Sequence, residues 1–175
     1  MSGVVAKPAP PAPARQGRVR PVLIHPHPAL RHRCDPAAAL SRDRINELAA
    51  DLLATMYDAG GRGLAAPQIG KPWRIFVMDH GWKEGAPSPR IVIDPEIEPL
   101  GSEVGTMEEA CLSIPDHPVA VTRPVTVRLR CLDLAGQPQS LTLTGIEARI
   151  AQHEADHLDG RLILDFGTGP QDTGE

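Results

Sequence analysis

The sequence predicts an α+β fold, with one helix near the start, antiparallel strands in the middle and a second helix near the end. Three observations lead to this prediction. Apolar residues recur at helical spacing between residues 41 and 61. Short apolar runs separated by turn residues fill most of the segment from residue 74 to residue 144. A second helical pattern begins at Thr144 and ends at Gly160.

The first 20 residues, MSGVVAKPAPPAPARQGRVR, contain too few large apolar side chains to fold, so we expect a disordered Pro/Ala-rich tail at 1–20. The tail has no apolar core of a secretion signal. It is rich in Pro and Ala rather than Ser, which favours a plain tail over an organelle transit peptide. The 175-residue length suits one catalytic domain, expected at 21–168, with a flexible C-terminus at 169–175.

The first helix is expected within the segment SRDRINELAADLLATMYDAGG. Ser41 can cap its N-terminus, and Gly60 and Gly61 can end it. Its apolar residues follow helical spacing: Ile45, Leu48, Ala49, Leu52, Leu53 and Met56.

The middle of the chain is expected to form short strands. In the run 125–132, Val125, Val127, Leu129 and Cys131 alternate with polar residues, as in a strand with one buried face. LAGQ (134–137) is expected to be the hairpin turn that follows. The apolar runs are RIFVM (74–78), RIVID (90–94), ACLSI (110–114), VAVT (119–122), VTVRLRCL (125–132) and SLTLT (140–144).

The last helix carries the strongest chemical signal. It is expected to start with a capping box between Thr144 and Glu147. His153 and His157 lie four residues apart, so their Cβ atoms would be roughly 5–6 Å apart on one helix face and could reach one metal. Glu154 beside them suits a general base acting on a water at the metal. The alternative is a polar helix end that matches H-E-x-x-H by chance.

A metal site on this helix needs a third protein ligand. Downstream, only Asp159, Asp165 and the terminal Glu175 are available, and the two aspartates are weak candidates. Cys111 lies upstream in EEACLSIP, where the flanking acids would raise the pKa of a free thiol and make it a poor nucleophile. As a metal-bound thiolate, however, Cys111 makes chemical sense.

Two other cysteines compete with Cys111 as ligands. Cys34 lies in a polar, irregular stretch, and Cys131 continues the apolar face of a strand. Three widely spaced cysteines are not a disulfide framework and are typical of a reducing cytosol, so we expect a cytoplasmic protein.

A glycine-rich segment, GGRGLAAPQIG (60–70), allows close backbone approach by a ligand, and Gln68 within it could donate to a developing oxyanion. It lacks the G-K-[ST] ending of a phosphate loop. Taken alone, the segment favours the alternative of a helix C-cap followed by a turn.

Charge and hydropathy exclude two classes of partner. The net charge of −4, from 18 basic and 22 acidic residues, argues against a dedicated nucleic-acid binder. No apolar run approaches the ~20 residues of a membrane helix.

Three segments together resemble the polypeptide deformylase family. They are GRGLAAPQ (61–68), EACLS (109–113) and QHEADHL (152–158), in the family's order. The resemblance extends from about Pro21 to Asp165 and includes HPHPALR, MYDAGG, IDPEI and GRLILD. Three separated motifs in one order are a far more specific signal than any one of them.

The resemblance implies antiparallel sheets packed around the C-terminal HExxH helix. It also implies metal-dependent removal of the N-formyl group from the initiator methionine of nascent polypeptides, with release of formate. The metal ligands would be Cys111, His153 and His157. The ion would be one divalent metal, with Fe2+ expected and Zn2+, Ni2+ or Co2+ as alternatives that the same donors accept.

The remaining roles are also implied by the resemblance. Glu154 would move protons, and the Gln68 amide and the backbone N–H of Leu112 would stabilise the oxyanion. The substrate, an N-formylmethionyl peptide, would bind as an added strand near Gly63 and position 110. Further out, Glu109 and Asp156 would support the ligands, with Arg123 as their partner.

The chain departs from the family pattern in three places. Arg62 replaces an apolar residue, and its guanidinium is expected at the pocket rim, reaching water. Ala110 replaces glycine and adds a methyl group beside the substrate strand. Only FGTGPQDTGE follows Asp165 where many bacterial members have a helix linked to ribosome docking, so we expect no more than transient ribosome contact.

Two alternatives to an active deformylase remain open in the sequence. One is a specialised or catalytically weak deformylase-like paralogue that binds peptides, which Arg62 and Ala110 leave open. The other is a generic zinc protease, which would need a third ligand other than cysteine.

Overall fold

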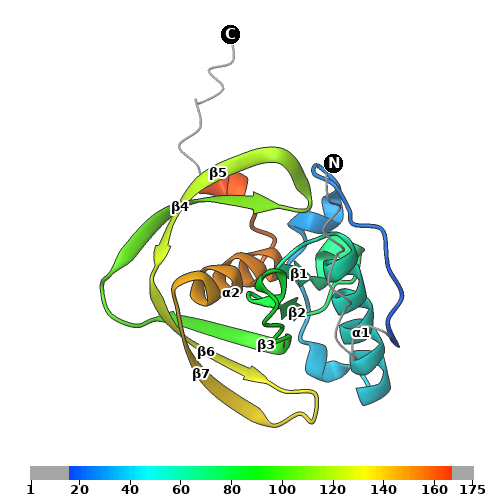
Figure 1. Cartoon of the computed structure of the whole chain (residues 1–175). Helices are drawn as coiled ribbons and strands as arrows, with labels where there is room; N and C mark the ends of the chain where they lie inside the picture. Colours follow the sequence, from blue (N-terminus) through cyan, green and yellow to red (C-terminus); the bar gives the residue numbers. More distant parts are fainter. Residues whose placement is uncertain (1–15, 167–175) are drawn as a thin grey trace.

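Residues 16–166 of the chain are described by a computed structural model, shown in Figure 1. In chain order its helices and strands are α1 (Arg42–Asp58), β1 (Gly63–Ala65), β2 (Ile75–Met78), β3 (Arg90–Pro99), β4 (Val104–Cys111), β5 (Ile114–Pro124), β6 (Thr126–Leu132), β7 (Pro138–Thr144) and α2 (Gly145–Leu158). All paired strands are antiparallel, in a five-stranded sheet of order β1-β2-β3-β6-β7 and a separate β4-β5 hairpin. The predicted α+β class is confirmed.

The helix α2 lies in the middle of the fold, with the five-stranded sheet on one side and the β4-β5 hairpin on the other (Figure 1). Side chains along β2 show how the two helices share the sheet. Ile75 and Val77 belong to a core cluster with α1, whereas Phe76 and Met78 belong to a second cluster with α2. Because both faces of β2 are covered, its sequence IFVM is apolar throughout rather than alternating.

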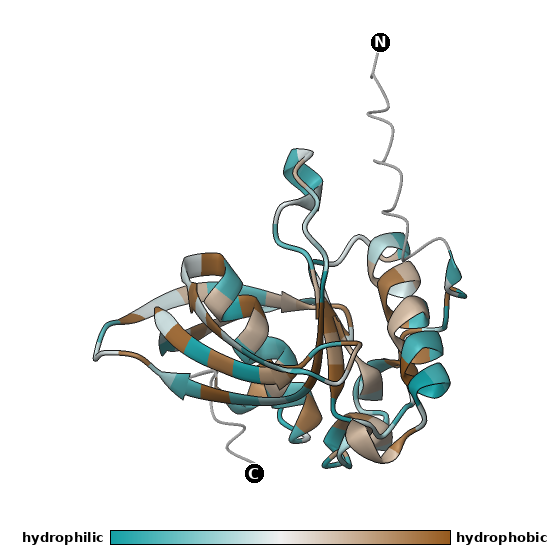
Figure 2. Cartoon of the chain, turned by 90° about the horizontal axis from the view of Figure 1, so that it is seen from below, coloured by the Kyte–Doolittle hydropathy of each residue, from teal (hydrophilic) through white to brown (hydrophobic). Residues whose placement is uncertain are grey.

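The strands β6 and β7, at one end of the sheet, have one buried face. Val127, Leu129 and Cys131 point into the core, as the alternation in the sequence predicts. Figure 2 shows this pattern as brown and teal bands along the strands. Residues between β6 and β7 form the predicted hairpin turn, with Gly136 in the left-handed region at φ +76°.

The first helix follows its predicted signals closely. The Ser41 side chain accepts a hydrogen bond from the backbone N–H of Arg44, which caps the N-terminus. The helix ends at Asp58, and Gly60 adopts a left-handed conformation just beyond it. Neither α1, nor α2, nor any shorter helix within residues 16–166 has the length and apolarity that a membrane crossing requires.

The strand expected at 110–114 is wrong in its boundaries. Cys111 ends β4, a two-residue turn follows, and Ile114 begins β5. No apolar pattern in the sequence marks β4 separately, because most of its side chains are exposed and only Glu109 and Cys111 are buried. A strand of a two-stranded hairpin at the surface needs no apolar run, so periodicity could not reveal it.

The predicted capping box of the last helix is also wrong. Thr144 does occupy the N-cap position of α2, but its side chain makes no capping hydrogen bond. Glu147 instead pairs with His80 Nδ1 at 3.2 Å and with Arg90 at 3.5 Å, both from outside the helix. Tertiary partners have therefore replaced the local contact that the sequence suggested.

The folded domain begins before residue 21, the position at which the sequence predicts its start. Residues 1–15 of that tail lie outside the described residues. The backbone N–H groups of Arg18 and Arg20 donate to the side chains of Asp51 and Thr55 on α1, and the Arg20 guanidinium pairs with Asp51 at 2.7 Å. The segment just before residue 21 thus belongs with the domain.

We expect deletion of residues 1–15 to leave the melting temperature and kcat/KM unchanged, because these residues carry few large apolar side chains and no motif. Deletion through Arg20 should lower the melting temperature by roughly 2–10 °C, since it removes the partners of Asp51, which is 5% exposed. Calorimetry of both truncations checks this. Equal melting temperatures for the two would show that the contacts to Asp51 contribute nothing.

Candidate metal centre and active site

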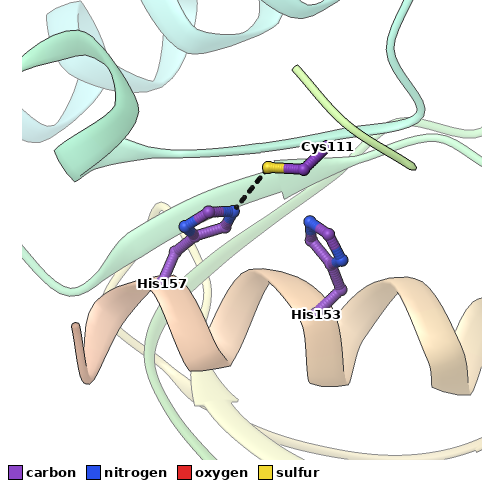
Figure 3. Close-up of side chains that lie close together, drawn as sticks. All are labelled: Cys111, His153 and His157. Carbon is purple, nitrogen blue, oxygen red and sulfur yellow. Dashed lines mark hydrogen bonds between the residues drawn. The ribbon is translucent and has the colours of Figure 1, made fainter. Parts of the chain in front are cut away.

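Three potential metal donors converge between β4 and α2. Cys111 comes from the end of β4, and His153 and His157 come from adjacent turns of α2. One ligand atom from each lies within 4.8 Å of the others, and Cys111 Sγ is 3.3 Å from His157 Nε2. Figure 3 shows both imidazoles rising from the same side of α2 toward the sulfur.

The donor set fits a divalent metal. A thiolate and two imidazoles are the donors that zinc and other late divalent transition metals accept. Burial, together with the charge on His153, lowers the pKa of His157 well below its ordinary value and keeps that ring in the neutral form that binds metals. Cys111 and His153 also line the adjoining cavity, so the centre has access to a ligand.

The competing ligand candidates lie elsewhere in the described structure. Asp159 pairs with Arg74 at 2.7 Å, and Asp165 pairs with Arg31 at 2.6 Å. Cys34 and Cys131 are buried in the core cluster packed on α2 and join no group of potential ligands within residues 16–166. Burial raises the pKa of the Cys34 thiol to about 11, so that thiol is inert at neutral pH.

His153 is oriented by a buried carboxylate. Its Nδ1 is 2.9 Å from Glu109 Oε2, which turns the other ring nitrogen toward the centre. Burial lowers the pKa of His153, but hydrogen bonds with Cys111 and Glu109 outweigh it and raise the pKa to about 10. A metal binds the neutral ring, so metal binding at His153 displaces a proton.

The expected partnership of Arg123 with Glu109 and Asp156 is confirmed. Arg123 donates to both oxygens of Glu109, at 2.6 and 3.0 Å, and to Asp156 at 2.8 Å. Burial acts to raise the pKa of Glu109, but the hydrogen bonds from His153 and Arg123 lower it to about 2. Glu109 therefore stays a carboxylate and can hold the His153 ring across the neutral pH range.

Glu154 is buried against β1. The residue is only 4% exposed, and its Oε2 has no hydrogen-bond partner among the described atoms. Burial raises the pKa of Glu154 to about 7, which suits a group that both takes and gives a proton near neutral pH. A Cβ at Gly63 would overlap this carboxylate, so any other residue there would displace the Glu154 side chain.

Gln68 is held with its amide N–H2 toward the centre. Its Oε1 accepts from the backbone N–H of Ala65 at 2.9 Å, and Nε2 donates to Ser113 Oγ at 3.1 Å and approaches Cys111 Sγ at 3.7 Å. Ser113 is fully buried, and no pattern in the sequence pointed to its contact with Gln68. The contacts fix the amide as a donor in the cavity wall.

A cavity of about 520 Å³ adjoins the donors. It lies between the segment around Gly63 in β1 and the segment around Ala110 in β4, and Leu112 closes it near Gly61. Apolar side chains from β4 and α2 line one part of it: Met107, Ile146 and Ile150. Of the nine residues that the sequence analysis assigned to the site, only His157 does not line the cavity.

Arg62 lies at the rim of this cavity and turns away from it. Its guanidinium donates to the backbone carbonyl of His80 at 2.8 Å and to the Glu84 carboxylate, and a third of the side chain is exposed. The expected outward orientation is thus seen, and Glu84 offsets the charge.

We expect Arg62→Val to leave kcat/KM within a few-fold for neutral formyl-methionyl peptides, the substrates that the resemblance implies. An exposed ion pair such as Arg62–Glu84 contributes only about 0.2–1 kcal/mol. Any preference for acidic residues after the methionine should be small, and salt should weaken it. Glu84→Gln serves as the matched control, and peptide series differing in the second residue give the measurement. An increase of orders of magnitude for Arg62→Val would mean that Arg62 blocks the pocket.

Comparisons with known proteins place this geometry in context. The family model for polypeptide deformylase matches residues 19–171. The chain is 44% identical to the peptide deformylase of Brucella suis over 148 residues, which is 84% of this chain and 83% of that protein.

Two solved structures have a similar fold. The peptide deformylase of Thermotoga maritima is 34% identical, with a TM-score of 0.79 over 87% of this chain and 99% of that one. The Met-Ala-Ser-bound class I type b peptide deformylase of Acinetobacter baumannii is 33% identical, with a TM-score of 0.77 over 85% of this chain and 98% of that one.

Proposed function

This chain belongs to the polypeptide deformylase family, and we propose that Cys111, His153 and His157 hold the single divalent metal of its active site. As a family member the protein is a metallohydrolase that removes the N-formyl group from the initiator methionine of nascent polypeptides. The observation that carries the residue assignment is the convergence of one sulfur and two imidazoles beside a buried, unpartnered Glu154 oxygen.

The peptide substrate is proposed to lie as an added strand between β1 and β4. Gly63 and Ala110 border the cavity from these two strands, and an extended peptide there could pair with their backbones. Met107, Ile146 and Ile150 offer an apolar wall for the methionine side chain. The Met-Ala-Ser peptide bound to the Acinetobacter baumannii relative supports a peptide in this family's site. Ala110 is exposed at the cavity edge.

The hydrolysis follows from the groups around the cavity. When bound, a divalent metal lowers the pKa of a coordinated water and polarises a carbonyl oxygen. Glu154 takes a proton from the attacking water as the water oxygen bonds to the formyl carbon. The Gln68 amide and the backbone N–H of Leu112 donate to the resulting oxyanion. Glu154 then gives the proton to the amine nitrogen as the C–N bond breaks, which releases formate and a free N-terminus.

We propose iron(II) as the ion in the cell, with zinc, nickel and cobalt as ions that the same three donors accept. Metal analysis of protein purified without oxygen identifies it. We further propose a cytoplasmic location with transient ribosome contact, because the substrate is the first residue of a newly made polypeptide.

The activity itself is tested with formyl-Met-Ala-Ser. Release of formate is expected, while N-acetyl-Met-Ala-Ser, whose larger acyl group should not fit beside Gly63, serves as the matched control. A metal-loaded protein that releases no formate would favour the weak, peptide-binding paralogue. Cleavage of internal peptide bonds would favour a zinc protease.

A further inference from the structure

A buried arginine on α2 connects the helix to both strands of the β4-β5 hairpin. Arg149 is 8% exposed and lies one turn before His153, on the same side of the helix. Its guanidinium donates to the carbonyls of Gly105 in β4 at 2.7 Å and Val121 in β5 at 2.9 Å. The same group donates to Glu109 Oε1 at 2.7 Å.

The contact with Glu109 completes the hydrogen bonding of that carboxylate. Oε1 accepts from Arg123 and Arg149, and Oε2 accepts from Arg123 and lies against His153 Nδ1. A carboxylate with two donors on each oxygen has little freedom to rotate or shift. Without Arg149, Oε1 would keep only the donor from Arg123, and Glu109 would lose its contact with the first half of α2.

Arg149 also balances the charge of this group. Arg123 is shared between Glu109 and Asp156, and Asp156 also faces Arg161 at 3.6 Å. Arg149 supplies a second guanidinium to Glu109 itself. Without it, the buried Glu109 carboxylate would lose one of its two guanidinium partners next to the metal ligands, which is costly in a water-poor site.

We propose that Arg149 is a positioning residue for the metal centre, acting through Glu109 on the ring of His153 while it holds α2 against the β4-β5 hairpin. The proposal rests on the proposed metal site. Arg149 touches no reacting atom in this scheme, and its effect should therefore appear in metal binding as well as in turnover.

The test measures cobalt(II) binding to the metal-free full-length protein, with the visible spectrum of the bound ion as a second readout. Arg149→Met keeps an unbranched apolar stem but removes the donors. Loss of a group that orients a metal ligand typically weakens metal affinity roughly 10–100-fold, so we expect the Kd for cobalt(II) to rise by that factor and its spectrum to shift.

The route through Glu109 is tested by a double-mutant cycle. Glu109→Gln should weaken cobalt(II) binding by itself. In that background Arg149→Met should change the Kd by no more than about threefold, because both substitutions break the same chain of contacts. An Arg149→Met variant with the wild-type Kd, an undiminished Arg149→Met effect in the Glu109→Gln background, or a Glu109→Gln variant with the wild-type Kd would each overturn the proposal.

Arg90→Met is the matched control, because Arg90 also joins α2 to a strand but contacts Glu147 rather than Glu109. Its Kd should stay near that of the wild type, and an equal loss would attribute the effect to general loosening of α2. If Arg149→Met does not fold, Arg149→Lys decides. One ammonium group cannot serve all three acceptors, so a several-fold rise in Kd is expected, and an unchanged Kd contradicts the proposal.

Failure of this inference differs from failure of the metal site itself. If the wild-type protein binds cobalt(II) and Cys111→Ser does not, the metal site stands whatever Arg149→Met shows. If Cys111→Ser binds cobalt(II) as the wild type does, the site assignment fails first.

Discussion

Cys111→Ser should remove stoichiometric metal from the protein. The thiolate is the soft, anionic member of the donor set, and a serine hydroxyl is a hard, neutral replacement that late transition metals bind poorly. Two imidazoles alone would then have to hold the ion, and formate release should fall with the metal content. Metal analysis after purification without oxygen gives the measurement.

Cys131→Ser is the matched control for this substitution. Cys131 is also a buried cysteine on a strand, but it lies in the core cluster on β6 and not at the centre. Its substitution should lower the melting temperature and leave one metal per chain. Full metal content in Cys111→Ser would contradict the assignment.

Glu154→Gln should retain the metal and the fold while losing most turnover. An amide has the same shape but cannot accept the proton of the attacking water or return it to the amine. General acid–base groups typically contribute about 10²–10⁴-fold to the rate, and this residue would serve both proton transfers. We therefore expect kcat to fall by at least about 100-fold, with a smaller change in KM.

A control variant and a stability measurement test the role of Glu154 further. Glu147→Gln alters a glutamate on the same helix whose partners are His80 and Arg90, so it should leave kcat within a few-fold. The Glu154→Gln variant should be at least as stable to heat as the wild type, because the buried carboxylate has an unpartnered oxygen. Near-normal turnover with normal metal content would exclude Glu154 as the proton carrier.

The chain's local patterns were sufficient for the elements with strong periodicity. The spacing of Leu48, Leu52 and Met56 located α1, and the alternation from Val125 to Cys131 located β6. The rise of a helix is fixed, so the pair of His153 and His157 was certain to share one face once α2 formed. These features depend on neighbours within a few residues, which the sequence presents directly.

The position of the third ligand depended on packing. The residues by themselves left Asp159, Asp165, Cys34 and Cys131 beside Cys111, and the resemblance to a family chose among them. In the fold the two aspartates are paired with Arg74 and Arg31, and the end of β4 brings Cys111 over α2. No spacing rule links β4 to α2, because their approach is set by the cores on both sides of the helix.

The roles of Arg149 and Gly63 also depend on tertiary packing. In the sequence, Arg149 is one polar residue on a helix, and Gly63 is one of several glycines in a turn-like segment. In the structure, Arg149 donates to three acceptors on two strands. A side chain at position 63 would overlap the Glu154 carboxylate, which explains the glycine there. The sequence alone located the strongly periodic elements and showed which chemical groups they carry. Only the tertiary structure decided which of those groups meet, because each such contact joins residues far apart in the chain.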